Sequence, residues 1–72
     1  MDKEFVAKIA KNIKKLREKR GLSQLALALE IGVTPGAIAN IETLRSDITA
    51  TRLNSIARVL GVEPYELLKF DK

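Results

Sequence analysis

Apolar side chains recur along this chain at intervals of three and four residues, the spacing that places them on one face of an α-helix. In the first twenty residues the apolar positions include Phe5, Ile9, Ile13 and Leu16, and lysines fill several of the positions between them. No segment alternates between apolar and polar residues as a half-buried strand does. The pattern therefore predicts an all-α fold.

Residues that cap helices divide this pattern into five segments. Gly21 is expected to end the first helix in the left-handed conformation. Each of four later starts has an apolar residue, a capping residue and a second apolar residue five positions after the first, the spacing of a hydrophobic staple. The apolar pairs are Leu22 with Leu27, Val33 with Ile38, Ile48 with Leu53 and Val62 with Leu67, around Ser23, Thr34, Thr49 and Glu63. The expected helices span about residues 2–19, 24–31, 35–43, 50–60 and 64–70.

Length and composition exclude several classes of protein. We expect residues 1–72 to form one domain, and a chain of this size buries only about 60% of its unfolded surface, so oligomerisation would help it. Cysteine and histidine are absent, which removes the usual metal ligands and the usual general base. We therefore expect no metal, no cofactor and no enzymatic activity. The sequence has no signal peptide and no run of about 18 apolar residues, so we expect a soluble, cytoplasmic protein without membrane contact.

Charge is distributed unevenly along the chain. Residues 1–20 hold eight basic and three acidic side chains (+5), residues 21–44 hold two acids and no base (−2), and residues 45–72 hold five bases and four acids (+1). Basic flanks of this kind suit a polyanion such as DNA, and a solvated, lysine-rich helix face is the alternative. The charge thus lies on either side of the central segment.

The central segment, QLALALEIGVTPGAIANIE, has the spacing of a helix-turn-helix. With Gln24 as its first position, Ala28 is the fifth, Gly32 the ninth, Ile38 the fifteenth and Ile41 the eighteenth. The apolar residues turn two short helices toward each other across the glycine, and the small alanine lets the two backbones approach. The segment is therefore expected to pack as a pair of helices.

Taken together, these motifs resemble the Cro/repressor (Xre-type) helix-turn-helix family of bacterial and phage transcription regulators. The resemblance covers about residues 9–68 and rests on Ile13, Leu16, Arg17, Gly21 to Gln24, Leu27, Ala28, Ile31 to Val33, Ile38, Ile41, Glu42, Leu53, Ile56, Ala57, Leu60 to Val62 and Glu66 to Leu68. It implies a compact five-helix, lambda-repressor-like domain with the helix-turn-helix formed by helices 2 and 3.

In this family the second helix of the pair lies in the major groove of DNA. The resemblance assigns the groove-facing positions to Thr34, Pro35, Gly36, Ala39 and Asn40. Only Asn40 has a side chain that can make a paired donor and acceptor contact, which suits adenine, and a solvated polar residue is the alternative. Thr34 is expected to cap its helix rather than read a base. The family usually has Arg, Gln, Ser or Lys at some of these positions, so the shape of the DNA would supply part of the specificity.

The resemblance also implies phosphate contacts, with ordinary solvated charges as the alternative. They fall at the start of the first motif helix, just after the groove helix, and one helix later: Ser23, Gln24, Thr43, Arg45, Ser46 and Arg52. The family often has a Gly-Lys turn after the glutamate, and this chain has Thr43-Leu44-Arg45 there instead. By the same resemblance, Arg17 and Glu42 are expected to form a largely buried ion pair.

Two apolar sets exceed what one small core is expected to cover. Tyr65, Leu68 and Phe70 near the carboxyl end are the expected dimer interface. Leu25 and Leu29, four apart on one helix, occupy positions where relatives usually have polar residues. Either the first turn of the first helix covers these two leucines, or another chain does.

These observations predict a sequence-specific transcription regulator that binds double-stranded DNA as a homodimer on a palindromic operator, with residues 35–43 in the major groove. No site for a small-molecule effector is evident. The resemblance suggests three settings: a phage-type repressor, a restriction-modification controller, or an antitoxin that represses its own operon. The alternative is a protein-interaction module, a helix-turn-helix that has lost DNA binding and acts as an antagonist or an antitoxin-like partner.

Overall fold

The computed structural model describes residues 2–70, and its regular elements there are all helical. They are α1 (Lys3–Lys19), α2 (Gln24–Ile31), α3 (Pro35–Glu42), α4 (Ala50–Leu60) and the 3₁₀-helix η1 (Pro64–Leu68). The all-α prediction is confirmed, and the observed ends of the four α-helices lie within one residue of the predicted ones.

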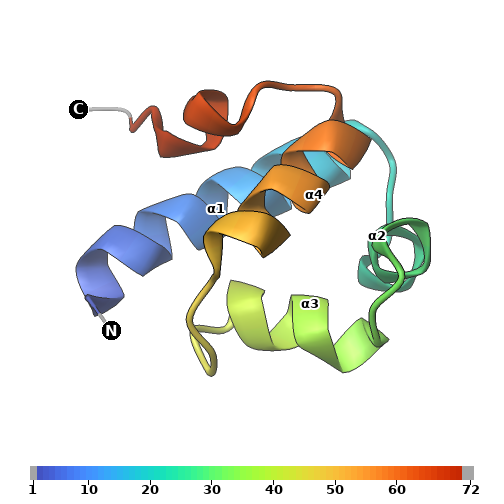
Figure 1. Ribbon diagram of the computed structural model, residues 1–72, viewed down its shortest axis with the longest axis horizontal. Coiled ribbons are helices and arrows are strands. Elements are labelled where there is room, and N and C mark those ends of the chain that lie inside the picture. Colours follow the sequence, from blue (N-terminus) through green and yellow to red (C-terminus); the bar gives the residue numbers. More distant parts are fainter. Residues whose placement is uncertain (1, 71–72) are drawn as a thin grey trace.

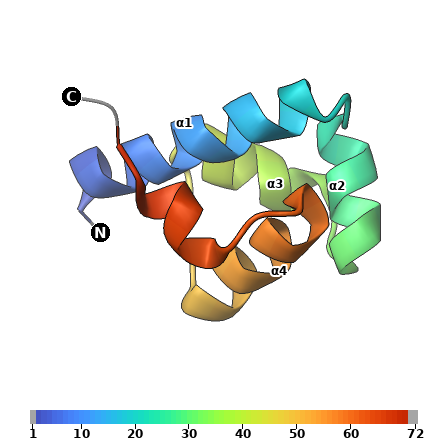
Figure 2. The same ribbon diagram turned by 90° about the horizontal axis from the view of Figure 1, so that it is seen from above.

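The helices surround a single core. In Figure 1, α1 and α4 cross the middle of the molecule, α3 lies below them, η1 lies above, and α2 closes one end. Seen from above, η1 lies between α1 and α4 (Figure 2). The core draws on every element: it contains Ile9, Ile13, Leu27, Ala28, Ile38, Ile41, Ile56, Ala57, Leu60 and Leu67. The helical spacing in the sequence therefore marks the buried face of each helix.

Two hydroxyl side chains fix the starts of α2 and α4 as expected for N-caps. Ser23 Oγ accepts a hydrogen bond from the Ala26 N–H at 2.9 Å, and Thr49 Oγ1 accepts one from the Arg52 N–H at 3.1 Å. Each bond satisfies an amide that has no partner within its helix. At the first helix, Asp2 acts in the same way on the Phe5 N–H.

The turn between α2 and α3 sets the angle of the helix-turn-helix. Gly32 takes a left-handed backbone with φ of +76°, a conformation that costs glycine little because it has no Cβ. The two helices meet at a bend of 118°, within the range usual for this motif.

Of the helices in residues 2–70, none alone is long and apolar enough to cross a membrane. The bent pair α2 and α3 taken together would be long and apolar enough by length and composition only.

The prediction of a fifth α-helix over residues 64–70 is not confirmed. The segment is a five-residue 3₁₀-helix, and its bonds run from Glu66 N–H to Glu63 O and from Lys69 N–H to Glu66 O. Asn12 on α1 explains why it ends there, because its side-chain amide donates to the carbonyls of Leu67 and Lys69, at 2.9 Å each. These carbonyls are therefore satisfied by α1 instead of by a further helical turn.

Candidate nucleic-acid interface

A buried ion pair holds the carboxyl end of α3 against α1. Arg17 Nε donates to Glu42 Oε2 at 2.8 Å and Arg17 Nη2 donates to Oε1 at 3.0 Å, with the two side chains only 9% and 3% exposed. Arg17 Nη1 also donates to the Leu22 carbonyl, and Gln24 Nε2 donates to Glu42 Oε1 at 3.1 Å. The Glu42 carboxylate thus joins α1, α2 and α3. Hydrogen bonds to a charged group are stronger than those between neutral groups, and a buried charge usually has such partners.

Both members of this pair are held in their charged forms. Hydrogen bonding to Glu42 raises the pKa of Arg17, outweighing its burial. Burial alone would raise the pKa of Glu42, but hydrogen bonds from Arg17 and Gln24 outweigh that effect, so the pKa lies below its ordinary value. The pair therefore stays ionised across the neutral range and fixes the position of α3.

The amino end of α3 differs from the expectation for Thr34. This residue occupies the N-cap position, yet its side chain makes no capping hydrogen bond, so the prediction that its hydroxyl caps the helix is wrong. The Ala37 N–H donates instead to the main-chain carbonyl of Thr34 at 3.0 Å, and Pro35 has no N–H to offer. The hydroxyl at this end of the helix is left for an external partner.

The outer side of α3 faces away from the rest of the molecule, along its lower edge in Figure 1. Of the five residues assigned to base contact, Thr34, Pro35, Gly36 and Asn40 are exposed and Ala39 is half-buried. None is charged. Because Pro35, Gly36 and Ala39 have small side chains, a ligand can approach the helix backbone closely on this side.

A shallow hollow of about 290 Å³ lies between α3 and the start of α4, and we call it the α3–α4 hollow. Its lining includes Asn40, Ser46, Asp47, Thr49 and Arg52. Three residues predicted to contact DNA, one for a base and two for phosphates, therefore share one site. Asp47 and Thr49 were missed as site residues by the sequence analysis, which used Thr49 only as the cap of a helix and gave Asp47 no role.

Beyond α3 the chain turns sharply through Leu44, which takes a left-handed backbone with φ of +63°. The Leu44 N–H donates to Ile41 O at 3.2 Å and the Arg45 N–H donates to Asn40 O at 2.8 Å. This pattern is a Schellman motif, in which the left-handed position is usually glycine. Leucine is disfavoured there because its Cβ crowds the following carbonyl. The loop after α3 is thus strained at one residue.

Several residues predicted to contact phosphates already have partners within the chain. Ser23 caps α2, Gln24 binds Glu42, and Thr43 Oγ1 donates to Ala39 O at 2.7 Å. Arg45 is exposed, while Arg52 is half-buried at the α3–α4 hollow. These two arginines are the first cations after residues 21–44, which contain no Lys or Arg. They are also the cations nearest in sequence to α3.

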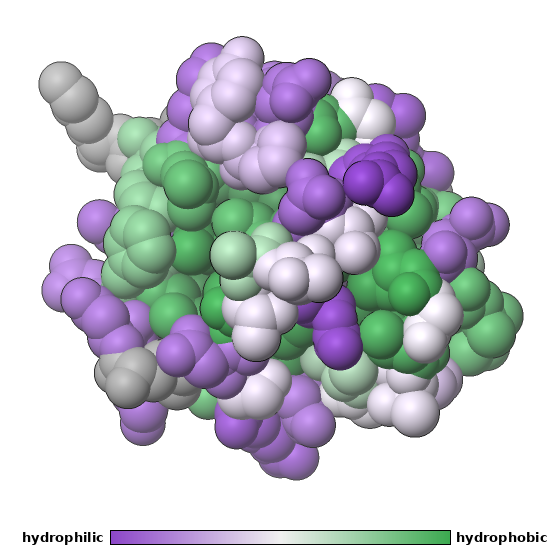
Figure 3. Space-filling model, viewed as in Figure 1, coloured by the Kyte–Doolittle hydropathy of each residue, from purple (hydrophilic) through white to green (hydrophobic). Residues whose placement is uncertain are grey.

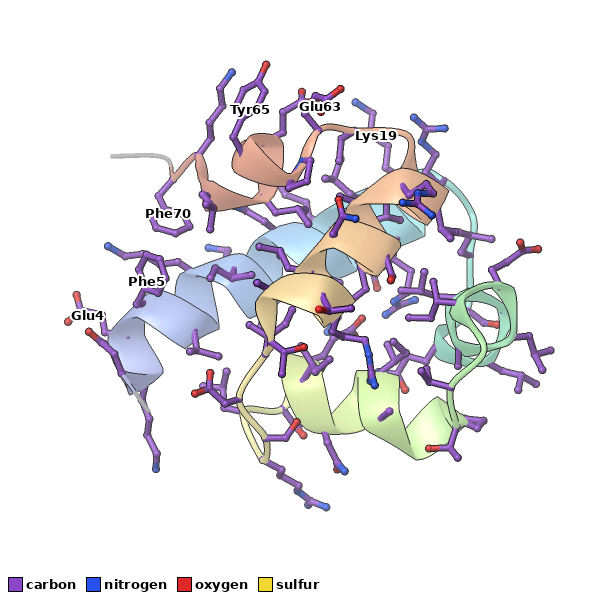
Figure 4. The ribbon with its side chains drawn as sticks, in the orientation of Figure 1. Glu4, Phe5, Lys19, Glu63, Tyr65 and Phe70 are labelled. Carbon is purple, nitrogen blue, oxygen red and sulfur yellow. The ribbon has the colours of Figure 1, made fainter. Side chains whose placement is uncertain are left out.

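The residues predicted to form the dimer interface are divided between surface and interior. Tyr65 is 59% exposed and Leu68 is 40% exposed. Phe70 is half-buried, and its ring meets that of Phe5 edge to face at a centroid distance of 5.7 Å (Figure 4). Lys8 lies 5.4 Å from the centre of the Phe70 ring. Phe70 therefore ties the carboxyl end to α1, while Tyr65 and Leu68 face outward.

Leu25 and Leu29 on α2 are not covered by the first turn of α1. They are 52% and 69% exposed, whereas Phe5 lies at the opposite end of the molecule beside Phe70 (Figure 4). Of the two explanations that the sequence left open, the structure excludes coverage by α1. The pair adds to the apolar surface seen where α2 lies in Figure 3.

Comparison with known proteins decides the family. A model of the helix-turn-helix family HTH_3 matches residues 13–67, which include both partners of the buried ion pair and the whole of α2 to α4. This chain belongs to the HTH_3 family. The resemblance to Xre-type regulators drawn from the sequence is thereby confirmed.

Solved structures of other HTH_3-like proteins have the same fold. The restriction-modification controller protein C.AhdI from Aeromonas hydrophila is 27% identical, with a TM-score of 0.82 over 86% of this chain and 94% of its own. The hypothetical transcription factor NHTF from Neisseria is 30% identical, with a TM-score of 0.88 over 97% and 82%. SinR, a master regulator for biofilm formation solved in complex with DNA, is 31% identical, with a TM-score of 0.78 over 85% and 98%. No curated protein sequence matches this HTH_3 chain significantly.

Proposed function

We propose that this HTH_3 protein is a transcription regulator that binds double-stranded DNA with α3 in the major groove. The observation that carries the proposal is the exposed outer side of α3 with Asn40 beside Ser46 and Arg52 in the α3–α4 hollow. The Arg17–Glu42 ion pair fixes the carboxyl end of this helix, so little ordering remains for binding. Similarity to regulators, one of them solved with DNA, supports the same function.

Base readout would fall mainly to Asn40, whose side-chain oxygen can accept from the N6 amino group of adenine while its side-chain NH2 donates to adenine N7. Thr34 could add a hydroxyl contact, since that group caps nothing within the chain. Pro35, Gly36 and Ala39 would contribute close approach and contact with thymine methyl groups. With one amide as the main reader, sequence-dependent DNA shape would supply the remaining specificity.

Affinity would rest on the DNA backbone more than on the bases. Arg45 and Arg52 supply charge next to α3, and Ser46 supplies a hydroxyl in the same loop. Thr43 would contact phosphate only by exchanging its bond to Ala39 O for one to the DNA. At the start of α2, Ser23 and Gln24 would add contacts from main-chain amides and the remaining side-chain groups, because both side chains already serve the fold.

We further propose that the protein acts as a homodimer on a palindromic operator, with half-sites about 34 Å apart or a multiple of that distance. Tyr65 and Leu68 are exposed near the carboxyl end and would lie at the seam, with Phe70 supporting them from inside. Such a protein would act in the cytoplasm, with occupancy set by its own concentration. Among the three settings, similarity to C.AhdI favours a restriction-modification controller.

A salt titration tests the DNA-binding proposal. The logarithm of the affinity for random duplex DNA should fall with the logarithm of the salt concentration, with a slope of about −0.9 for each phosphate neutralised. A dimer that uses Arg45 and Arg52 from each subunit should give a slope of several units. A protein that binds no duplex even at low salt would overturn the proposal.

One observation favours a second candidate, a protein-interaction module. Leu25 and Leu29 are exposed on α2, and the stretch from Gly21 to Leu44 carries no cation. A helix pair that binds only protein would not need cations there. In that case the titration would show no duplex binding, and Leu25→Lys together with Leu29→Lys would abolish binding to a protein partner. Retained duplex binding by this double variant is what the regulator proposal requires.

A further inference from the structure

A second hollow lies along α1, and its lining is basic. It has a volume of about 190 Å³ and is lined by Lys8, Lys11, Asn12, Lys15 and Phe70. We call it the lysine hollow. Its three lysines are exposed, and among residues 2–70 its lining contains no carboxylate. Three of the cations that make the first twenty residues basic are therefore gathered in one place, whereas the outer side of α3 carries none.

The lysine hollow and α3 lie on opposite sides of α1. Lys8 and Arg17 are nine residues apart, which is about two and a half helical turns, and Lys15 and Arg17 are about half a turn apart. Arg17 binds Glu42 at the end of α3, whereas Asn12 binds the carbonyls at the end of η1. In Figure 1, α3 lies below α1 and η1 lies above it. A duplex held by α3 therefore does not reach the lysine hollow.

Contacts within the chain fix the wall of the lysine hollow. Both amide hydrogens of Asn12 are used, because its Nδ2 donates to two carbonyls at the end of η1 at 2.9 Å each. Phe5 packs edge to face on the Phe70 ring, and Lys8 Nζ lies 5.4 Å from the centre of that ring. Asn12 and Phe70 therefore shape the hollow, while the lysines supply the charge that attracts a ligand.

The chemistry of the lining favours a nucleic-acid backbone as the ligand. The volume is below the roughly 300 Å³ at which sites for small organic molecules begin. Lysine is depleted at protein–protein interfaces, whereas interfaces with DNA are rich in positive charge. A lysine ammonium group also binds phosphate well as a point charge. Phosphates of a nucleic acid therefore fit the lysine hollow better than a metabolite or an acidic protein.

The spacing of the three lysines agrees with this ligand. Lys8, Lys11 and Lys15 follow one another at intervals of three and four residues, so they extend along about 10 Å of one side of the helix. One strand of a DNA duplex carries a phosphate about every 3.4 Å along its axis. A stretch of duplex of the same length therefore presents about three phosphates on each strand, enough for one to each lysine.

We propose that the lysine hollow binds the phosphate backbone of a second DNA duplex, so that one subunit holds two duplexes, one on α3 and one on α1. Binding at α1 carries no sequence information, because it uses phosphates alone. Binding at the lysine hollow stands without the proposed function, whereas the holding of two duplexes rests on it. A regulator of this kind would bring a second stretch of DNA to its operator.

The test counts the duplexes bound to each chain. A random-sequence duplex of about 10 base pairs, which is one helical turn, is added in excess at low salt. Sedimentation with dye-labelled duplex gives the number bound per protein chain at saturation. We expect two for the wild-type protein. Because the count is made per chain, dimerisation does not alter it.

Two matched variants locate the second duplex. One carries substitutions of the three lysines that line the hollow: Lys8→Gln, Lys11→Gln and Lys15→Gln. The control carries substitutions of three exposed lysines of α1 outside the lining: Lys3→Gln, Lys14→Gln and Lys19→Gln. Each variant loses three of the four units of net positive charge, and glutamine forms helices about as well as lysine. We expect one duplex per chain for the first variant and two for the control.

The counts separate this proposal from the proposed function. One duplex for both wild type and the hollow variant overturns the second duplex and leaves binding by α3 standing. One for wild type and none for the hollow variant overturns binding by α3 instead. No duplex on the wild-type protein overturns both. Equal counts for the two variants overturn the hollow as the location, since total charge would then decide.

Two further measurements complete the test. Poly-glutamate is titrated in the same way, and if it binds the wild type but not the hollow variant while the duplex count is one for both, the ligand is an acidic protein and the proposal is overturned. If the triple variant fails to fold, single substitutions decide. Lys11→Gln should reduce the salt slope of the second binding step by about 0.9, and Lys14→Gln should leave it unchanged. Equal slopes for these two would overturn the proposal.

Discussion

Arg17 on α1 and Glu42 at the end of α3 lie 25 positions apart in the sequence and share two hydrogen bonds, one through each carboxylate oxygen of Glu42. Neither residue reaches the outer side of α3. Their pairing instead determines where that side points, because Glu42 is the last residue of the helix that carries Asn40. The orientation of α3 thus depends on a contact made at its carboxyl end.

Removing one partner of this pair should destabilise the protein strongly. Arg17→Ala leaves the Glu42 carboxylate buried with only Gln24 as a partner, and breaking a buried pair in this way costs about 3 to 5 kcal/mol. Urea unfolding measures the loss. Lys11→Ala, on the exposed side of the same helix, should change stability by less than about 0.5 kcal/mol. Equal effects of the two substitutions would show that the ion pair does not hold α3 in place.

Stability should also depend on the ionisation of Glu42. Its pKa is lowered in the folded protein, so the unfolded chain binds its proton first as the pH falls. Stability from this group is fully present above the unfolded pKa, about 4.3, and is lost as the pH falls through the lower folded value. The difference in stability between wild type and Glu42→Gln should therefore be constant above the unfolded pKa and should narrow as the pH falls below it. Urea unfolding between pH 7 and pH 3 checks this, and parallel curves throughout would contradict it.

Leu44 should be replaceable by glycine with a gain in stability. A non-glycine residue in the left-handed region costs roughly 1 to 2 kcal/mol, and the greater freedom of glycine in the unfolded chain offsets about 0.5 to 1 kcal/mol of the relief. Leu44→Gly should therefore raise the unfolding free energy by about 0.5 to 1 kcal/mol.

Gly32 provides the reverse comparison for Leu44. Its φ is +76°, close to that of Leu44, and a Cβ added there meets no atom within 4 Å, so Gly32→Ala tests backbone strain alone. It should lower the unfolding free energy by about 1 kcal/mol. If both substitutions change stability in the same direction, strain at φ above zero is not what they report.

Thr34 and Ser23 should respond differently to removal of the hydroxyl. Ser23 caps α2 through the Ala26 N–H, so Ser23→Ala should cost about 1 kcal/mol in thermal unfolding. Thr34 makes no such bond, and Thr34→Ala should cost less than about 0.5 kcal/mol. A loss at Thr34 as large as at Ser23 would mean that its hydroxyl caps α3 in solution.

Asn40 and Arg52 should separate base reading from backbone binding. Asn40→Ala should lose about 1 to 3 kcal/mol on an operator selected from genomic fragments and almost nothing on random duplex. Arg52→Ala should weaken binding to both and reduce the salt slope by about 1. Competition titrations with the two duplexes measure these losses. Equal losses for Asn40→Ala on both duplexes would remove it as a reader of sequence.

The sequence predicted the helices well because their boundaries are set locally. Ser23 and Thr49 act on amides three residues away, and Gly32 adopts the backbone that its residue type favours. The family also followed from local spacing, since the positions of Ala28 and Ile41 depend on how two adjacent helices pack. Short-range rules were sufficient for these features.

The remaining features depend on contacts that spacing does not reveal. Asn12 ends η1 across 55 positions, which no local pattern predicts. Leu44 adopts a glycine conformation because the Schellman bonds require it, against the preference of its own residue type. Asp47 borders the α3–α4 hollow only because α3 and α4 converge there. The candidate site was therefore predicted as separate residues, and its arrangement came from the structure.

The hydrogen bonds from Asn12 also bear on the order in which the chain folds. They join residue 12 to residues 67 and 69, so the loop that they close includes most of the chain. Closing a long loop costs entropy that local contacts do not, so such contacts tend to form late. The helix-turn-helix, whose two helices are neighbours in sequence, can assemble before the carboxyl end docks. A chain still emerging from the ribosome would thus complete α2 and α3 before its carboxyl end docks on α1.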